Sequence, residues 1–360
     1  MRPLKEITRL SDKPTHATAG WKPLYLSLLV IAALLSLPTA CKHKSQAETE
    51  LERAVQTAPK LPDPEPPLAK IPVTQEIAVG RFFQFLDKIV QQYDSLDSYP
   101  LSENLLLRAN PWILDTLVNT DYYYQMSLGN FVYDQKKMRV LKPGDTLLIP
   151  GPKTAALLLE KMENTRLDIN IPAFELRILE GDSLLFTAPV RVGKKQKKYL
   201  EAAGHPVDLR TRTGMGEIIR VNRFPIFIDP VTGDRFKYTK RDDHRTTLMP
   251  QIPWLEPAIN GIRYGQMIHP TTNPRSLGKP ASNGCIGVSE ADAWRLYYFA
   301  PLGTKVTVRY DLQEINAQGD TLRYEDIYQL RRTVKSPKAI AVAGVWLKNT
   351  AGVCVCDTMF

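Results

Sequence analysis

The chain has 360 residues, of which 43% are hydrophobic and 24% are charged, and its net charge is +9. These values are ordinary for a globular protein with a hydrophobic core, and the length leaves room for two or three domains. Basic and aromatic residues do not alternate in any patch, which argues against a nucleic-acid partner.

The first forty residues have the form of an export signal. Five Lys and Arg residues precede an apolar run from Leu24 to Leu37, which is too short for a transmembrane helix but suits a signal peptide. The sequence Leu-Pro-Thr-Ala-Cys then ends at Cys41 and resembles a bacterial lipoprotein cleavage site, although its leucine lies four residues before the cysteine instead of three. We therefore expect a lipoprotein-type signal peptide over 1–40 and a lipidated Cys41 that anchors the body to a membrane, on the periplasmic side of the cell envelope. Ordinary secretion and an uncleaved signal anchor are the alternatives.

Residues 41–74 are predicted to be a linker, because six prolines between Pro59 and Pro72 disfavour a helix or a central strand. A small helical or α+β accessory region is expected over 75–151. Apolar residues recur every three or four positions from Ile77 to Tyr93, which predicts an amphipathic helix. A second, shorter helix interrupted at Pro111 is predicted between residues 105 and 118.

The end of the accessory region, residues 140–150, predicts a turn and a strand. Its last part resembles the final strand of a LysM glycan-binding module. The three tyrosines at 122–124 can stack on sugar rings or pack in a core, and we favour packing.

The stretch from 163 to 311 is predicted to consist mainly of short strands. Alternating or β-branched runs predict strands at 166–171, 175–179, 184–186, 190–192, 217–221, 265–268 and 305–310. One helix is predicted from Glu290 to Phe299, with Ser289 as its N-cap. This pattern predicts a mostly-β fold, a sandwich or half-open barrel with one main helix. Residues 312–360 are expected to be a C-terminal extension with a hairpin around Gly319, and the Cys354–Cys356 tail has no assigned role.

Fifteen residues separate His269 from Cys285. A cysteine is a useful nucleophile as its thiolate, and a neighbouring imidazole is the usual means of forming one near neutral pH. The Ser282-Asn283-Gly284 run before the cysteine predicts a tight turn, and the backbone N–H groups of Gly284 and Cys285 can point at a developing oxyanion. Because the histidine precedes the cysteine, a papain-like order is excluded.

This constellation lies in a stretch, from about Arg166 to Tyr310, that resembles the L,D-transpeptidase (YkuD-type) catalytic domain of bacterial cell-wall enzymes. His269 and the run Ser282–Cys285 match the family's central pattern. Further matches, in the family's order, are Val192-Gly193-Lys194, Thr211-Arg212-Thr213-Gly214, Glu290–Ala293 and Pro301–Val306.

Three positions depart from the family pattern. Asn283 stands where a second histidine is usual, Gly287 where an arginine is usual, and Arg212 where a proline is common. Asparagine cannot titrate near neutrality, which leaves His269 as the histidine of the motif that can serve as base. Arg275 and Arg295 are the candidates to replace the missing arginine.

The resemblance implies an envelope enzyme of peptidoglycan biosynthesis and cell shape. Cys285 would attack a stem peptide, release the terminal D-Ala and form a thioester acyl-enzyme, with His269 as base. Gly284, Asn283 and Ser282 would form the oxyanion turn. Candidate substrate-binding residues are Arg275, Tyr264 and Met267.

Two alternatives remain open: a carboxypeptidase or endopeptidase that trims stem peptides, and an inactive wall-binding lipoprotein. No metal or other cofactor is expected, because neither a metal-ligand spacing nor a phosphate-binding loop occurs. The acyl acceptor, the diamino acid of the stem, the membrane that holds the anchor and the oligomeric state are left open by the sequence.

Overall fold

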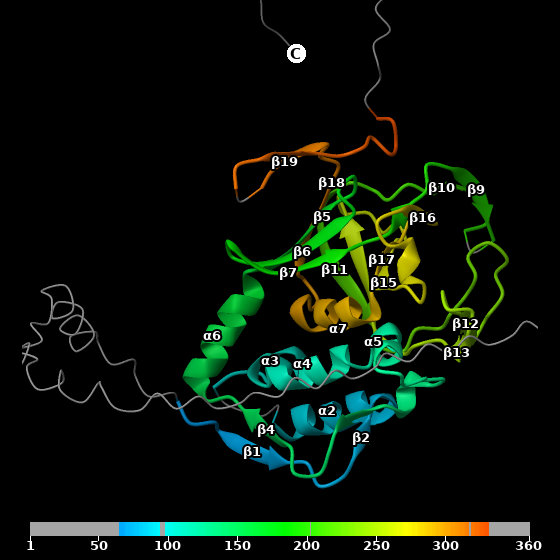
Figure 1. The fold of residues 1–360 in the computed structure, drawn as a ribbon. Helices are drawn as coiled ribbons and strands as arrows, with labels where there is room; N and C mark the ends of the chain where they lie inside the picture. Colours follow the sequence, from blue (N-terminus) through cyan, green and yellow to red (C-terminus); the bar gives the residue numbers. More distant parts are fainter. Residues whose placement is uncertain (1–64, 94–97, 202, 317, 331–360) are drawn as a thin grey trace, which may run out of the picture. The chain divides into compact units, whose positions relative to one another are not determined.

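The computed structural model describes residues 65–93, 98–201, 203–316 and 318–330 (Figure 1). Its largest element is an eight-stranded sheet with the strand order β17-β15-β14-β11-β18-β5-β6-β7. The pairs β15–β17 and β18–β5 are parallel and the other pairs are antiparallel. In chain order the strands are β5 (Thr165–Asn170), β6 (Glu175–Glu180), β7 (Ser183–Pro189), β11 (Gly214–Asn222), β14 (Trp254–Ile259), β15 (Ile268–Pro270), β17 (Ile286–Val288) and β18 (Lys305–Arg309).

The two edges of this sheet are joined by the residues that follow β7. Arg191 pairs with Gly287 of β17, the strand at the opposite edge. The Arg191 N–H donates to the Gly287 carbonyl at 2.9 Å, and the Gly287 N–H donates to the Arg191 carbonyl at 3.0 Å. Directly afterwards, β8 (Val192–Gly193) pairs in parallel with β16 (Pro280–Ser282). The sheet is therefore nearly closed, and the predicted mostly-β, half-open architecture is confirmed.

The predicted main helix is present as α7 (Glu290–Phe299). Its N-cap is Ser289, whose Oγ accepts a hydrogen bond from the Asp292 N–H at 3.0 Å, as the sequence predicted. Trp294 and Tyr298 are buried on this helix. Figure 1 shows α7 between the large sheet and two helices of the accessory region, α3 (Glu103–Ala109) and α4 (Pro111–Val118).

Both helical segments predicted in the accessory region are found. The amphipathic helix is α2 (Val79–Tyr93), which buries Phe82, Phe83 and Leu86. The interruption at Pro111 separates α3 from α4, and Pro111 occupies the first turn of α4, where its missing N–H has no helical partner to lose. The remaining elements of this region are β1 (Ala69–Pro72), β2 (Ile77–Ala78), α5 (Tyr122–Ser127), η1 (Gln135–Lys137), β3 (Arg139–Leu141), β4 (Thr146–Ile149) and α6 (Pro152–Glu163).

Two local expectations were wrong. The predicted linker contains β1, which pairs with β4 in a two-stranded sheet; Pro72 is tolerated because it lies at the end of that strand. The strand expected over 265–268 begins at Ile268, because Gly265 has a φ of +68°. Helices α5 and α6 were not predicted.

The last described residues form the predicted hairpin, β19 (Gln313–Ile315) and β20 (Thr321–Arg323). Two further hairpins, which the sequence did not predict, are β9 (Lys197–Leu200) with β10 (His205–Asp208) and β12 (Tyr238–Lys240) with β13 (Thr246–Leu248). A short 3-10 turn, η2 (Pro274–Ser276), follows β15.

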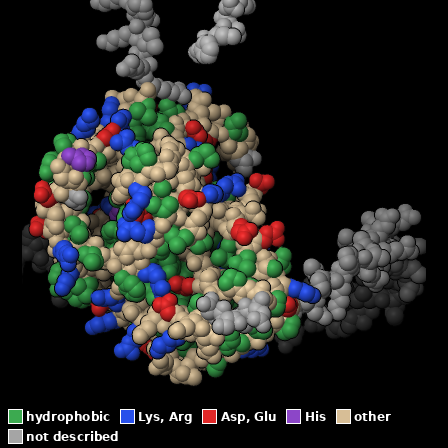
Figure 2. Space-filling view, turned by 180° about the vertical axis from the view of Figure 1, so that it is seen from behind, with side chains coloured by type: hydrophobic (Ala, Val, Ile, Leu, Met, Phe, Trp, Pro, Cys, Tyr) green, Lys and Arg blue, Asp and Glu red, His purple; other side chains and the backbone are tan. Residues whose placement is uncertain are grey.

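The accessory region and the sheet share one continuous hydrophobic core, which runs from Val73 to Tyr328. In the described part of the chain, no helix has the length and apolarity needed to cross a membrane. Figure 2 shows one face of the molecule, on which Lys and Arg side chains are scattered among apolar and acidic ones. The predicted signal peptide, Cys41, Cys354 and Cys356 lie outside the described residues.

Candidate active site

The residues before Cys285 form a tight turn between β16 and β17. Gly284 has a φ of +114°, a conformation that favours glycine, and a Cβ at this position would lie 2.6 Å from Nε2 of Gln266. Ser282 clamps the turn: its Oγ accepts from the Gly284 N–H at 3.1 Å and donates to the Cys285 carbonyl at 2.6 Å. The side chain of Asn283 makes no hydrogen bond to another described residue. Ser282 therefore shapes the turn.

The turn changes the expectation for the oxyanion donors. The Gly284 N–H already donates to Ser282, so this predicted donor is not free in the structure. The Cys285 N–H has no hydrogen-bond partner among the described residues. Of the two predicted donors, Cys285 is the one that remains available.

The sulfur of Cys285 is half-buried beside the strand that carries His269. Strands β15 and β17 run in parallel with Ile268 opposite Ile286 and His269 opposite Gly287. The Met267 N–H donates to Sγ of Cys285 at 3.4 Å. Because side chains two residues apart lie on one face of a strand, Cys285 and His269 share a face of adjacent strands.

The imidazole of His269 is held in one orientation. Its Nδ1 lies 2.9 Å from the Pro270 carbonyl, which can only accept, so Nδ1 carries the proton of the neutral ring and Nε2 is left as an acceptor. The Trp254 ring lies against it with a centroid distance of 4.8 Å. This tautomer is the one that a general base needs.

Both members of the pair are uncharged near neutral pH. Burial, with a further contribution from the Arg191 charge, lowers the pKa of His269 to about 4. Burial raises the pKa of the Cys285 thiol, against the hydrogen bond from Met267 and the charge of Arg191. At rest the thiol and the imidazole are therefore both neutral.

Three motif segments meet at the hydroxyl of Thr211. Its Oγ1 accepts from the Gly193 N–H at 2.9 Å and donates to the Gly284 carbonyl at 2.9 Å. Gly193 must be glycine, because a Cβ there would lie 1.8 Å from the Leu209 carbonyl oxygen. Tyr328 completes the support, since its hydroxyl accepts from the Thr211 N–H at 3.2 Å and donates to the Gly193 carbonyl at 2.8 Å. The C-terminal extension thus supports the turn, a role that the sequence did not indicate.

The remaining predicted residues are dispersed around the turn. Met267 contacts Cys285 through its backbone, whereas Tyr264 is 41% exposed and lies under the Arg212 guanidinium. Arg275 is exposed in η2, where its N–H donates to Asp242. Arg295 forms an ion pair with Asp292 on α7. The side chain that lies on Gly287, the position where the family arginine is usual, belongs to Arg191.

The hairpin β12–β13 is fixed next to β15 by the accessory region. The Tyr123 hydroxyl accepts from the Asp242 N–H at 2.7 Å and lies 3.2 Å from the Thr272 carbonyl. Behind it, Arg241 is fully buried and forms an ion pair with Glu290, whose Oε2 accepts from the Tyr122 N–H at 3.0 Å. Tyr122 and Tyr123 therefore pack against the catalytic region and form hydrogen bonds with it, while Tyr124 is exposed. The predicted packing role holds for the first two tyrosines.

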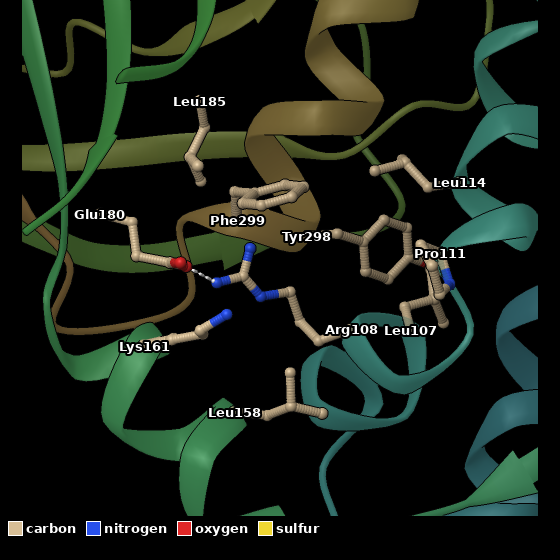
Figure 3. A pocket seen from close by; sticks show the side chains of 10 residues that line it. All are labelled: Leu107, Arg108, Pro111, Leu114, Leu158, Lys161, Glu180, Leu185, Tyr298 and Phe299. Carbon is tan, nitrogen blue, oxygen red and sulfur yellow. Dashed lines mark hydrogen bonds and ion pairs between the residues drawn. The ribbon is translucent and has the colours of Figure 1, made fainter. Parts of the chain in front are cut away.

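A separate cavity of about 200 Å³ lies between the accessory helices, β6, β7 and the end of α7 (Figure 3). Its lining is mostly apolar and is crossed by the ion pair of Arg108 and Glu180, and it includes neither Cys285 nor His269. No group of three or more metal-ligating side chains occurs in the described part of the chain.

The family profile of the L,D-transpeptidase catalytic domain (YkuD) matches residues 164–308. A curated protein from Bacillus licheniformis, whose name assigns it as the L,D-transpeptidase YkuD, is 28% identical over 165 residues, which are 46% of this chain and 74% of that protein. Residues 164–308 are therefore similar to the L,D-transpeptidase catalytic domain.

Solved L,D-transpeptidase structures are similar to this domain at low identity. One from Mycobacterium smegmatis is 16% identical, with 41% of this chain and 58% of that chain covered and a TM-score of 0.28. One from Xylanimonas cellulosilytica is also 16% identical, with 68% of this chain and 100% of that chain covered and a TM-score of 0.30. This chain thus spans little more than half the length of the mycobacterial protein.

Proposed function

We propose that this protein is a peptidoglycan L,D-transpeptidase in which Cys285 is the nucleophile and His269 the base. The observation that supports the proposal is that Cys285 directly precedes β17 while His269 lies on the adjacent strand β15, opposite Gly287, with Nδ1 bonded to the Pro270 carbonyl and Nε2 left unprotonated. The family match over residues 164–308 supplies the substrate class, a peptidoglycan stem peptide.

The chemistry follows from this pair. The Cys285 proton passes to Nε2 of His269 as the sulfur attacks the carbonyl carbon that precedes the terminal D-Ala. The Cys285 N–H faces the developing oxyanion; one such donor contributes about 2.7–4 kcal/mol in comparable sites. The imidazolium returns its proton to the departing D-Ala amine, and a thioester remains on the sulfur. An amine from a second stem then gives a cross-link, whereas water gives a trimmed stem.

The decisive experiment uses the purified ectodomain with disaccharide-tetrapeptides, and mass spectrometry of the products. Cross-linked dimers with loss of D-Ala support the proposal. Tripeptides alone would indicate a hydrolase, and no turnover with retained sacculus binding would indicate an inactive wall-binding protein. Cys285→Ala is the matched control, because it removes the sulfur and should abolish both reactions while it leaves binding intact. A carbapenem should form an adduct on wild-type Cys285 and none on the variant.

We further propose that the mature protein is a lipoprotein anchored through Cys41, with its catalytic domain in the periplasm. The support is the basic segment, the short apolar run and the small residues before Cys41. Replacement of Cys41 by Ser should move the protein from the membrane fraction to the soluble envelope fraction. Unchanged membrane association would contradict lipidation at this residue.

A further inference from the structure

An arginine from outside the segment Ser282–Cys285 lies close to Cys285 and His269. Arg191 is placed there by its backbone pairing with Gly287, which closes the sheet. Because Gly287 has no side chain, the arginine lies on its Cα: a Cβ on Gly287 would be 2.5 Å from Nε and 2.7 Å from Cγ of Arg191. Cys285 precedes Gly287 by two residues, and His269 is directly opposite Gly287. The guanidinium is thus adjacent to both.

The charge on Arg191 is not neutralised by a partner. Its Nε is shielded from solvent and has no hydrogen-bond partner, and no carboxylate among the described residues pairs with it. Other charged groups on the adjoining segments are Lys194 and Lys279, which form no ion pair with a described residue, and Arg212, which lies over the Tyr264 ring. Among the described residues, Arg191 is the charged side chain whose field acts on both Cys285 and His269.

We propose that Arg191 is a positioning residue that stabilises the anionic sulfur of Cys285 and keeps the His269 ring neutral. Forming a half-buried thiolate costs free energy unless a positive charge lies nearby. The unpaired guanidinium of Arg191 supplies that charge. The same charge disfavours a second cation on His269, so the resting ring stays neutral with Nε2 unprotonated. The inference deepens the proposed function by adding a residue to the same site.

The test follows the pH dependence of Cys285 alkylation by iodoacetamide, which needs no peptidoglycan. It is read by mass spectrometry of the peptide that contains Cys285, because the chain has three other cysteines. Under this assignment, Arg191→Met raises the alkylation midpoint by about one pH unit, so that the rate below the midpoint falls about tenfold. Arg191→Lys keeps the charge and should stay much closer to wild type. Arg323→Met, which removes an exposed arginine in β20, is the matched control and should leave the profile unchanged.

A second variant covers the case in which Arg191→Met does not fold. Gly287→Ala keeps the arginine but forces its side chain to move, because the added methyl group overlaps Nε and Cγ. Its midpoint should also rise. An unchanged midpoint in a folded Arg191→Met or Gly287→Ala protein overturns the assignment. If the midpoint shifts but tetrapeptides are not turned over, the proposed function fails and the role of Arg191 stands.

Discussion

Arg241 and Arg191 both have an Nε that is buried from solvent, but among the described residues only Arg241 has a hydrogen-bond partner for it. Arg241, at the junction of the accessory region and the catalytic domain, donates from Nε to Thr247 at 2.8 Å and from its terminal nitrogens to Glu290 and Gln135. Arg191, at the nucleophile, has a shielded Nε with no partner among the described residues. The charge of Arg241 is neutralised by Glu290 and stabilises the fold. The charge of Arg191 has no such partner in the described part of the chain and can shift the pKa of neighbouring groups.

The largest effect should come from removing the proposed nucleophile, Cys285, which lies beside Arg191. We expect Cys285→Ala to lower product formation by about 10⁴-fold or more, because no other thiol lies in the described part of the chain. The measurement is the rate of dimer or tripeptide formation from tetrapeptides. Thermal unfolding should be little changed, since the side chain is small and half-buried. Residual activity within tenfold of wild type would remove Cys285 from the mechanism.

Removing the ion pair between Arg241 and Glu290 should lower the stability of the fold. Arg241→Met leaves the buried Glu290 carboxylate without its counter-charge, and we expect the free energy of unfolding to fall by about 3–5 kcal/mol. The check is denaturant unfolding, with the double variant Arg241→Met, Glu290→Met as the control. The double variant should recover part of the loss, because it removes both charges. A loss below about 1 kcal/mol in the single variant would mean that this junction carries little of the stability.

His269 should make the fold sensitive to acid. Its pKa is about 4 in the folded protein and 6.5 without the fold, so the unfolded chain binds more protons between these values. The free energy of unfolding therefore falls as pH is lowered from 6.5 to 4, by about 3 kcal/mol from this group. Chemical denaturation at pH 7 and pH 4.5 should show a smaller acid loss in His269→Gln than in wild type. Equal losses in the two proteins would place the folded pKa near its ordinary value.

The smallest effect should come from the tyrosine that ties helix α5 to the hairpin β12–β13. Tyr122→Phe removes the hydrogen bond from its hydroxyl to Asp243, 2.7 Å long, and should lower the free energy of unfolding by about 1 kcal/mol. Tyr124→Phe is the matched control in the same helix turn, because Tyr124 is exposed. Similar losses in both variants would show that the bond to Asp243 contributes nothing specific.

Local signals in the sequence predicted local structure well. Helix α7 has its predicted bounds because Ser289 caps it and Asp292 supplies the capped N–H. The start of α6 is also encoded, since Pro152 stands at its first turn ahead of a run of Ala, Leu, Glu and Lys. The hairpin β12–β13 carries mixed polar residues and has no clear alternation, so its pairing depends on contacts distant in sequence.

The part of the site that lies within one segment was predictable from the sequence. The part that depends on the sheet topology was not. The turn at Ser282–Cys285 follows from its own residues. Arg191 lies 96 positions before Gly287, and no local pattern indicates that the chain after β7 returns to the far edge of the sheet. The predicted candidates Arg275 and Arg295 are nearer to Gly287 in sequence; Arg275 is exposed in η2, and Arg295 forms an ion pair with Asp292.

The raised pKa of the Cys285 thiol has a consequence for how long the protein survives outside the cytoplasm. Peroxides and disulfide exchange attack the thiolate, and a sulfur that stays protonated at rest offers them little of it. The same protonation slows alkylation of the sulfur at neutral pH. For a domain in the proposed periplasmic location, it protects Cys285 without a reducing system to repair it.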